Sequence, residues 1–298
     1  MARRSLSYHR ACAGHSVSPL QPNVRECARL YNNPSKRYRI FGEIKIKHLV
    51  IPDCQVKPGV NVDYLDRIGK YIVEKQPDKI ICLGDFADMP SLSSYDFGKK
   101  SFEGRRYVDD IEATKSAMAR LLAPLGDFNA RAKRNKGKRY TPELHLTLGN
   151  HEHRIDRAVE NDAKLEGVLG IKDLGYEEFG WTVYPFLDVV IIDDIAYSHY
   201  FTSGVMGRPV PNARQLAIKK HMSCVMGHVQ NWDMHRDVRA DGHPIITMFA
   251  GSCYTHNEDY LGPQGNTYDR GFWMLHEVKN GGFMPMYVSL DYMERKYG

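Results

Sequence analysis

Apolar runs and helical repeats alternate along the first part of the chain. The near-continuous apolar segments "IKIKHLVIPD" (44–53), "DKIICLGDFAD" (78–88) and "ELHLTLGNHEHR" (143–154) are typical of buried strands. Between them, "VDYLDRIGKYIVEKQ" (62–76) and "DIEATKSAMARLLAPL" (110–125) repeat apolar residues at helical spacing. This order predicts parallel strands that are joined by helices.

Short strands dominate the second part of the chain. Strands are predicted in five segments: "WTVYPFLDVVIIDDIAYSHY" (181–200), "SCVMGHVQNW" (223–232), "PIITMFAGSCY" (244–254), "GFWMLHEV" (271–278) and "MYVSLDYM" (286–293). Strands that first alternate with helices and later cluster favour an α/β fold, in which two mixed sheets pack together with helices outside. Residues 89–110 and 200–222 are expected to form rim loops, and no cap domain is visible.

The N-terminal segment differs from the rest of the 298 residues. Residues 1–42 are polar and basic, contain three prolines and lack periodicity, so we expect an N-terminal arm or small appendage, with residues 43–298 as one domain. Six scattered cysteines without a C-x-x-C pair favour buried thiols over disulfides. No apolar stretch reaches the roughly 18 residues that span a bilayer, and no sustained apolar segment follows the basic start. We therefore expect a cytoplasmic protein without a membrane partner.

The net charge of the chain does not indicate a different class of protein. The formal net charge of +5 is modest, and much of it lies in residues 1–47 and in "RAKRNKGKRY" (131–140). Such a cluster is more typical of a solvated loop than of a nucleic-acid groove.

Oxygen and nitrogen donors follow the ends of the predicted strands. They are Asp53, Asp85 with Asp88, Asn150 with His151, His199 and His228. The carboxyl ends of strands in an open α/β sheet are where ligands bind. Carboxylate, amide and imidazole groups suit hard or borderline divalent cations, and no thiolate is among them. Each motif alone is a weak signal, but the series predicts a site for two metal ions.

The motifs "PDCQ", "LGDFAD", "LGNHEHR", "YSHY" and "MGHVQ" resemble, in this order, those of the calcineurin-like metallophosphoesterase superfamily. The pattern of that family is D-x-H, G-D-x-x-D, G-N-H-E/D, a lone H and G-H-x-H. The resemblance covers residues 48 to about 253. It implies a four-layer α-β-β-α sandwich of two mixed β-sheets flanked by helices. "FADMPSLSSYD", "FEGRRY" and "LGPQGN" are similar to bacteriophage-encoded members, which would act in the host cytoplasm.

The resemblance also implies a set of ligands. Asp85 would bridge both ions, and Asp53 would bind the first ion. Asn150, His199 and His228 would bind the second ion. In this family two ions hold a hydroxide that attacks the phosphate in line, and no phosphoenzyme is required.

The residue after Asn150 has a different role in the family. His151 would face the substrate and protonate the leaving oxygen as general acid, with Asp88 orienting its ring. This agrees with ordinary acid-base chemistry, because a carboxylate fixes the imidazole tautomer and favours its charged form.

Two positions depart from the family pattern. Gln55 replaces the histidine of D-x-H, and Gln230 replaces the last histidine of G-H-x-H. Both would have served the first ion, which would then contact only oxygen donors. Such a set favours Mn²⁺ or Mg²⁺ over Zn²⁺, and the predicted ion is Mn²⁺, with Mg²⁺, Zn²⁺ or iron as alternatives. The alternative is that neither glutamine is a ligand and the first site is vestigial.

Four further residues are candidates for substrate binding. Arg154 and Arg157 lie just past His151 and could hold phosphate oxygens, or they could be ordinary surface residues. Tyr254 and His256 lie in the loop after the strand predicted at 244–254.

The sequence thus predicts a metal-dependent phosphoesterase that acts on a phosphodiester or a nucleotide phosphate. The alternatives are a DNA exonuclease or endonuclease, which would use residues 1–42 and 131–139 to track the phosphate backbone, and a phosphoprotein phosphatase. A non-catalytic binding module with a degenerate first metal site is a fourth possibility. The oligomeric state is left open.

Overall fold

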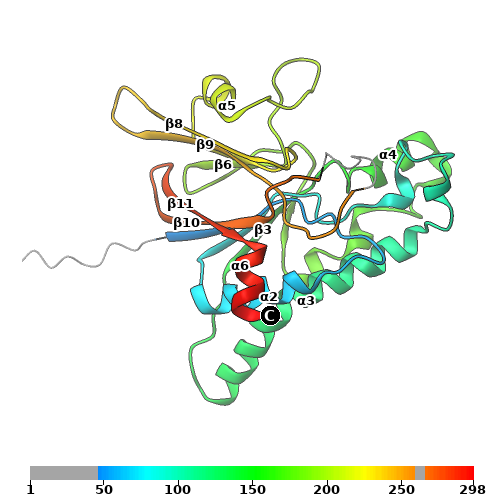
Figure 1. The fold of residues 1–298 in the computed structure, drawn as a ribbon, viewed down its shortest axis with the longest axis horizontal. Helices are drawn as coiled ribbons and strands as arrows, with labels where there is room; N and C mark the ends of the chain where they lie inside the picture. Colours follow the sequence, from blue (N-terminus) through cyan, green and yellow to red (C-terminus); the bar gives the residue numbers. More distant parts are fainter. Residues whose placement is uncertain (1–45, 259–265) are drawn as a thin grey trace, which may run out of the picture. The chain divides into compact units, whose positions relative to one another are not determined.

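Two mixed β-sheets form the centre of the protein (Figure 1). The computed structural model describes residues 46–258 and 266–298, which belong to one compact unit, Lys45–Gly298. The arm expected at residues 1–42 lies outside the described residues.

The first sheet has six strands in the order β11-β10-β1-β2-β3-β4. Their bounds are β1 Ile46–Ile51, β2 Lys79–Cys82, β3 Glu143–Thr147, β4 Thr182–Tyr184, β10 Gly271–Lys279 and β11 Gly282–Ser289. Strands β1 to β4 are parallel, whereas β10 pairs antiparallel with both β1 and β11. The parallel strands therefore bring the residues at their carboxyl ends to the same edge of the sheet.

The second sheet has five strands in the order β5-β6-β7-β9-β8. Their bounds are β5 Val190–Ile192, β6 Ile195–Ser198, β7 Cys224–Met226, β8 Trp232–Val238 and β9 Pro244–Ala250. Strands β6, β7 and β9 are parallel, and the two edge strands are antiparallel to their neighbours.

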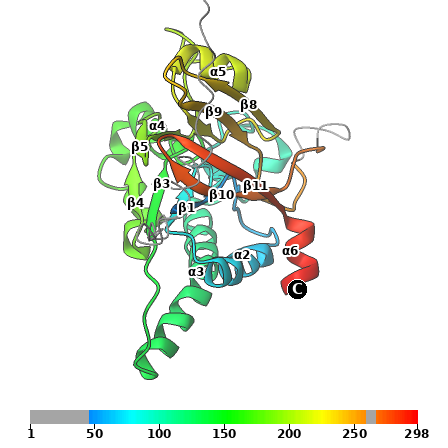
Figure 2. The same cartoon turned by 90° about the vertical axis from the view of Figure 1, so that its left-hand side faces the viewer.

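Helices cover the outer face of each sheet, as Figures 1 and 2 show. Helices α2 (Asp63–Lys75), α3 (Tyr107–Arg134) and α6 (Leu290–Tyr297) share an apolar core with the six-stranded sheet. Helix α5 (Ala213–Lys220) packs on the five-stranded sheet, and a third core fills the space between the sheets. The expected four-layer α-β-β-α sandwich is confirmed.

The remaining helical segments connect these layers. They are α4 (Arg154–Asn161) and five short 3₁₀ turns at Pro90–Leu92, Lys100–Phe102, Ala163–Leu165, Ile171–Leu174 and Glu177–Phe179. No helix in the described ranges is long and apolar enough to cross a bilayer. Four cysteines are described, Cys54, Cys82, Cys224 and Cys253, and all are buried free thiols as predicted.

Helix α3 is longer than its sequence pattern predicts. It continues through Pro124 to Arg134, and so the start of the basic cluster at 131–140 is helical instead of a loop. Pro124 and the carbonyl of Leu121 lie against α2 at Gly69, where a Cβ atom would come within 2.4 Å of that carbonyl oxygen. This close packing holds the helix together where the proline removes a hydrogen bond.

The basic end of α3 lies far from its first turn. A helix of 28 residues is about 40 Å long at roughly 1.5 Å per residue. The C-terminal end of α3, drawn in green, extends away from both sheets (Figure 2).

Two further helices correct the predicted strands and loops. Residues 290–293, predicted as part of a strand, begin α6, because the Ser289 side chain accepts a hydrogen bond from the Tyr292 N–H at 3.2 Å. Residues 213–220, predicted as part of a rim loop, form α5, which Asn212 caps through the Gln215 N–H at 2.9 Å.

Candidate active site

The donors predicted at the strand ends meet at one edge of the two sheets. Asp53, Asp85 and Asn150 come after β1, β2 and β3 of the first sheet, and His199 and His228 come after β6 and β7 of the second. Ligand atoms of Asp85, His199 and His228 lie within 4.8 Å of one another. A carboxylate and two imidazoles at this spacing can hold one divalent cation.

Asn150 lies between the two histidines of this cluster. Its Oδ1 is 2.9 Å from Nε2 of His199 and 2.8 Å from Nδ1 of His228. The other ring nitrogen of His199 donates to the Leu83 carbonyl at 2.7 Å, which fixes the ring and turns Nε2 toward Asp85 Oδ2 at 3.4 Å. The structure therefore brings these candidate ligands together in one cluster.

The two histidines differ in charge. Burial opposes a proton on His199, but the charge of Asp85 outweighs it and raises the pKa of His199 to about 9. Burial and the nearby His199 lower the pKa of His228 to about 4. Asp85 thus favours a protonated ring at His199, whereas burial favours a neutral ring at His228.

Asp53 and Gln55 supply buried polar atoms without partners. Asp53 Oδ1 accepts the N–H of His228 at 3.0 Å, but its Oδ2 and both amide atoms of Gln55 have no hydrogen-bond partner in the described part of the chain. Burial and the charge of Asp85 raise the pKa of Asp53 to about 7. An unpaired buried polar group costs about 1–3 kcal/mol, so Asp53 Oδ2 and Gln55 Oε1 fit a cation that they would coordinate, whereas the amide nitrogen of Gln55 can only donate.

Glycines allow the carboxylates to approach the backbone closely. A Cβ atom on Gly149 would lie 2.1 Å from Asp85 Oδ1, and one on Gly227 would lie 2.5 Å from Asp53 Oδ1. Any side chain at these positions would displace the carboxylates. The glycines of "LGNHEHR" and "MGHVQ" therefore have a steric function.

Glu152 is a buried carboxylate that the sequence analysis missed. It accepts the N–H groups of Asp85 at 2.9 Å, Ala87 at 3.0 Å and Gly149 at 2.9 Å, and the Tyr176 hydroxyl at 3.2 Å. It thereby joins the loop after β2 to the loop after β3. No signal within the polar run "GNHEHR" distinguishes it from an exposed glutamate.

His151 and Asp88 form the pair that the sequence predicts. Nδ1 of His151 is 2.7 Å from Asp88 Oδ1, and its Nε2 is 3.8 Å from Asp85 Oδ2. Burial opposes a charge on the ring, but Asp85 and Asp88 together raise the pKa of His151. The pair thus favours a protonated imidazole.

Arg154 contacts both members of this pair. Its Nη1 donates to the Asp88 carbonyl at 2.8 Å, and its Nη2 is 3.2 Å from Nε2 of His151. A guanidinium only donates, so this contact requires Nε2 to accept. Arg154 and a proton therefore compete for the same nitrogen atom.

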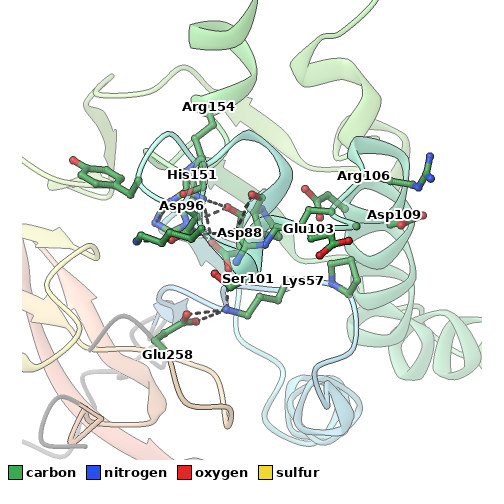
Figure 3. A pocket seen from close by; sticks show the side chains of 18 of the residues that line it. Lys57, Asp88, Asp96, Ser101, Glu103, Arg106, Asp109, His151, Arg154 and Glu258 are labelled. Carbon is green, nitrogen blue, oxygen red and sulfur yellow. Dashed lines mark hydrogen bonds and ion pairs between the residues drawn. The ribbon is translucent and has the colours of Figure 1, made fainter. Parts of the chain in front are cut away.

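Lys57 and Glu258 extend the pair and were also missed by the sequence analysis. Lys57 Nζ lies 3.0 Å from Asp88 Oδ2 and 2.7 Å from Glu258 Oε1 (Figure 3). Burial opposes the charge on Asp88, but His151, Lys57 and Arg154 hold its pKa below the usual range. Asp88 is thus an anion held by Lys57, Arg154 and the His151 ring.

Two cavities open beside these residues. The smaller, of about 310 Å³, is lined by Asp85, Asn150, His151, His228 and Gln230 together with Val229, Asn231 and Tyr268. The larger, of about 920 Å³, shares Asn150 and His151 with it and extends over residues of the predicted rim at 89–110. His151 therefore stands between the cation cluster and a space large enough for a small molecule.

Of the other predicted site residues, Gln230 lines one of these two cavities, and Tyr254, His256 and Arg157 line neither. Gln230 lines the smaller cavity, and its Oε1 accepts the hydroxyl of the buried Tyr254 at 2.5 Å. His256 stacks on Tyr254 and contacts Glu258 at 2.7 Å. Arg157 is exposed on α4 and lines neither cavity.

Comparisons with known proteins do not identify a family for this chain. No protein-family model matches the chain, and no curated protein matches it. Solved structures that align with it include a conserved uncharacterized protein, a predicted phosphoesterase, from Streptococcus pneumoniae TIGR4. That alignment has 13% identity, covers 83% of this chain and 91% of the other, and has a TM-score of 0.35. The phosphoesterase Yfce from E. coli aligns at 12% identity over 82% of this chain and all of its own (100%), with a TM-score of 0.33. The function must therefore be inferred from the chain's own residues.

Proposed function

We propose that this protein is a metal-dependent phosphoesterase that hydrolyses a phosphodiester or a nucleotide phosphate. The observation that carries the proposal is the convergence of Asp85, His199 and His228 around Asn150, with the pair of His151 and Asp88 at its edge. The family resemblance of the five motifs supports it. Membership of the calcineurin-like superfamily, a bacteriophage-encoded origin and a cytoplasmic location belong to the same proposal.

Two cations would share this site. Asp53, Gln55, Asp85 and Gln230 would hold the first, and Asp85, Asn150, His199 and His228 the second. Bound cations neutralise phosphate oxygens and lower the pKa of water. The orphaned atoms of Asp53 and Gln55 support the first position.

Side chains of the protein would protonate the leaving oxygen and bind the phosphate. His151 would donate the proton on Nε2 to the leaving oxygen, while Asp88 fixes the ring through Nδ1. Arg154 would leave Nε2 and turn to the phosphate, because an anionic ester attracts the guanidinium more strongly than a neutral imidazole does, and Nε2 would then take up from solvent the proton that it donates. Lys57 keeps Asp88 in place throughout.

The proposed activity can be tested with bis-p-nitrophenyl phosphate and p-nitrophenyl phosphate in Mn²⁺. We expect hydrolysis of the diester to exceed that of the monoester. His151→Ala should lower kcat about 100-fold or more for an alkyl leaving group, and less for p-nitrophenol, which leaves without a proton. Turnover that is absent with both esters, in Mn²⁺, Mg²⁺ and Zn²⁺, would contradict the proposal and favour a binding module.

We further propose that the first cation is Mn²⁺ and is weakly held, because its ligands are all oxygen atoms. Calorimetric titration should show one tighter and one weaker Mn²⁺ per chain, and Gln55→His should raise the affinity of the weaker position for Zn²⁺. Tight stoichiometric binding of Zn²⁺ at both positions of the native protein would refute the preference.

A further inference from the structure

The larger cavity lies on the leaving-group side of the proposed reaction. It shares Asn150 and His151 with the smaller cavity, and its wall continues to Tyr95 and to the first turn of α3. Figure 3 shows Arg106 and Asp109 on the α3 side of this space, across from His151 and Arg154. A group attached to the phosphate through the oxygen that His151 protonates would enter this space.

Tyr95 is an exposed aromatic side chain on the wall of the cavity. It is 81% exposed and lines the cavity, whereas the equally exposed Phe97 does not line it. The neighbouring Asp96 is held by Arg105 at 2.8 Å, and Arg105 donates to the Pro90 carbonyl at 3.1 Å. The backbone beside Tyr95 is therefore anchored while its ring is free to stack on a planar ligand.

Two carboxylates on the cavity wall can recognise a planar ligand that carries amino groups. Glu103 and Asp109 are exposed, line the cavity and form no salt bridge within the described ranges. Lys99 and Arg106 line the same wall, so its charge is mixed, but Glu103 and Asp109 remain available as hydrogen-bond acceptors. They accept hydrogen bonds from amino groups, which adenine, guanine and cytosine present.

We propose that this cavity binds the nucleoside of a small nucleotide substrate, with the base stacked on Tyr95 and its amino group facing Glu103 or Asp109. This inference rests on the proposed phosphoesterase function, because the phosphate would be held at the cation cluster. It identifies the substrate as a nucleoside ester of phosphate with an amino-bearing base. The volume of about 920 Å³ accommodates a nucleoside.

Ligand affinity tests the inference, and it is measured in the His151→Ala background, where hydrolysis of an ester with an alkyl leaving group is slowed about 100-fold or more. Adenosine 5′-monophosphate and ribose 5-phosphate carry the same sugar phosphate, and only the first has a base. In calorimetric titrations of the full chain with Mn²⁺, we expect adenosine 5′-monophosphate to bind about tenfold more tightly, the order of gain from one base on one aromatic ring. Tyr95→Ala should abolish this difference and leave the affinity for ribose 5-phosphate unchanged.

Two variants control for the loss of an exposed aromatic group. Tyr95→Phe keeps the stacking face, and Phe97→Ala removes an equally exposed ring that does not line the cavity; both should retain the tenfold difference. Equal affinities of the His151→Ala protein for the two ligands, or a difference that persists when Tyr95→Ala is added, would overturn the inference even if the native protein hydrolyses phosphodiesters. Failure of both ligands to bind would overturn the inference together with the proposed function.

Discussion

The variant Asp85→Asn is expected to lose about a thousandfold or more of kcat for bis-p-nitrophenyl phosphate. Asp85 is buried, faces His199 and His151 through the same oxygen atom, and would bind both cations. Removing its charge takes away several kcal/mol of electrostatic stabilisation, and about 4 kcal/mol corresponds to a thousandfold in rate. Calorimetry should show weaker binding at both cation positions.

An acidic side chain elsewhere provides the matched control for this variant. Asp127→Asn makes the same chemical change at an exposed position on α3 and should leave both kcat and cation binding unaltered. Circular dichroism of both variants separates a lost site from a lost fold. If Asp85→Asn retains activity within tenfold of the native protein, or loses only one cation, Asp85 does not bridge the two ions.

The cation cluster could be predicted because it depends on a rule of topology. Parallel strands β1 to β3 end at one edge of a sheet, and so the polar residues just beyond them must lie near one another. His199 and His228 obey the same rule in the second sheet, although nothing in the pattern shows that the two edges coincide. The series of donors suggested one shared site, and the family resemblance implied which ion each residue would bind.

Residues whose role depends on a distant partner were not predictable in this way. Lys57 and Glu258 are separated by 201 positions, and their ion pair brings a charge to Asp88 that no local pattern indicates. Glu152 binds backbone N–H groups of loops before it in the chain, and such acceptors leave no trace in side-chain periodicity. Their burial is a property of the folded sheet edge alone.

Helix ends were the weakest part of the sequence prediction. Pro124 locally favours the end of a helix, because proline cannot donate a backbone hydrogen bond. The packing of Gly69 against Pro124 outweighs this loss. At residues 286–293 an apolar pattern continued across Ser289, where the capping hydroxyl changes a strand into a helix. A short apolar run does not by itself distinguish the two structures.

The variant Glu152→Ala is expected to lower the free energy of unfolding by about 3 kcal/mol, because each buried N–H left unpaired costs about 1–3 kcal/mol. It would leave three such groups, those of Asp85, Ala87 and Gly149, without the acceptor that they share. Burial and the charge of Asp85 raise the pKa of Glu152, so part of the gain from these hydrogen bonds is already offset in the native protein. Urea denaturation in the presence of a chelator measures the effect without any contribution from bound cations.

Three comparisons decide whether Glu152 acts through these hydrogen bonds. Glu160→Ala removes an exposed carboxylate from α4 and should change stability by no more than about 0.5 kcal/mol. Glu152→Gln keeps one acceptor oxygen but turns an amide N–H toward a backbone N–H, so its stability should lie between those of the native protein and Glu152→Ala. Because the loops that Glu152 joins carry Asp85 and Asn150, both variants should also bind cations more weakly. A change below about 1 kcal/mol in Glu152→Ala would show that these backbone groups find other partners and that the loops hold their positions without the carboxylate.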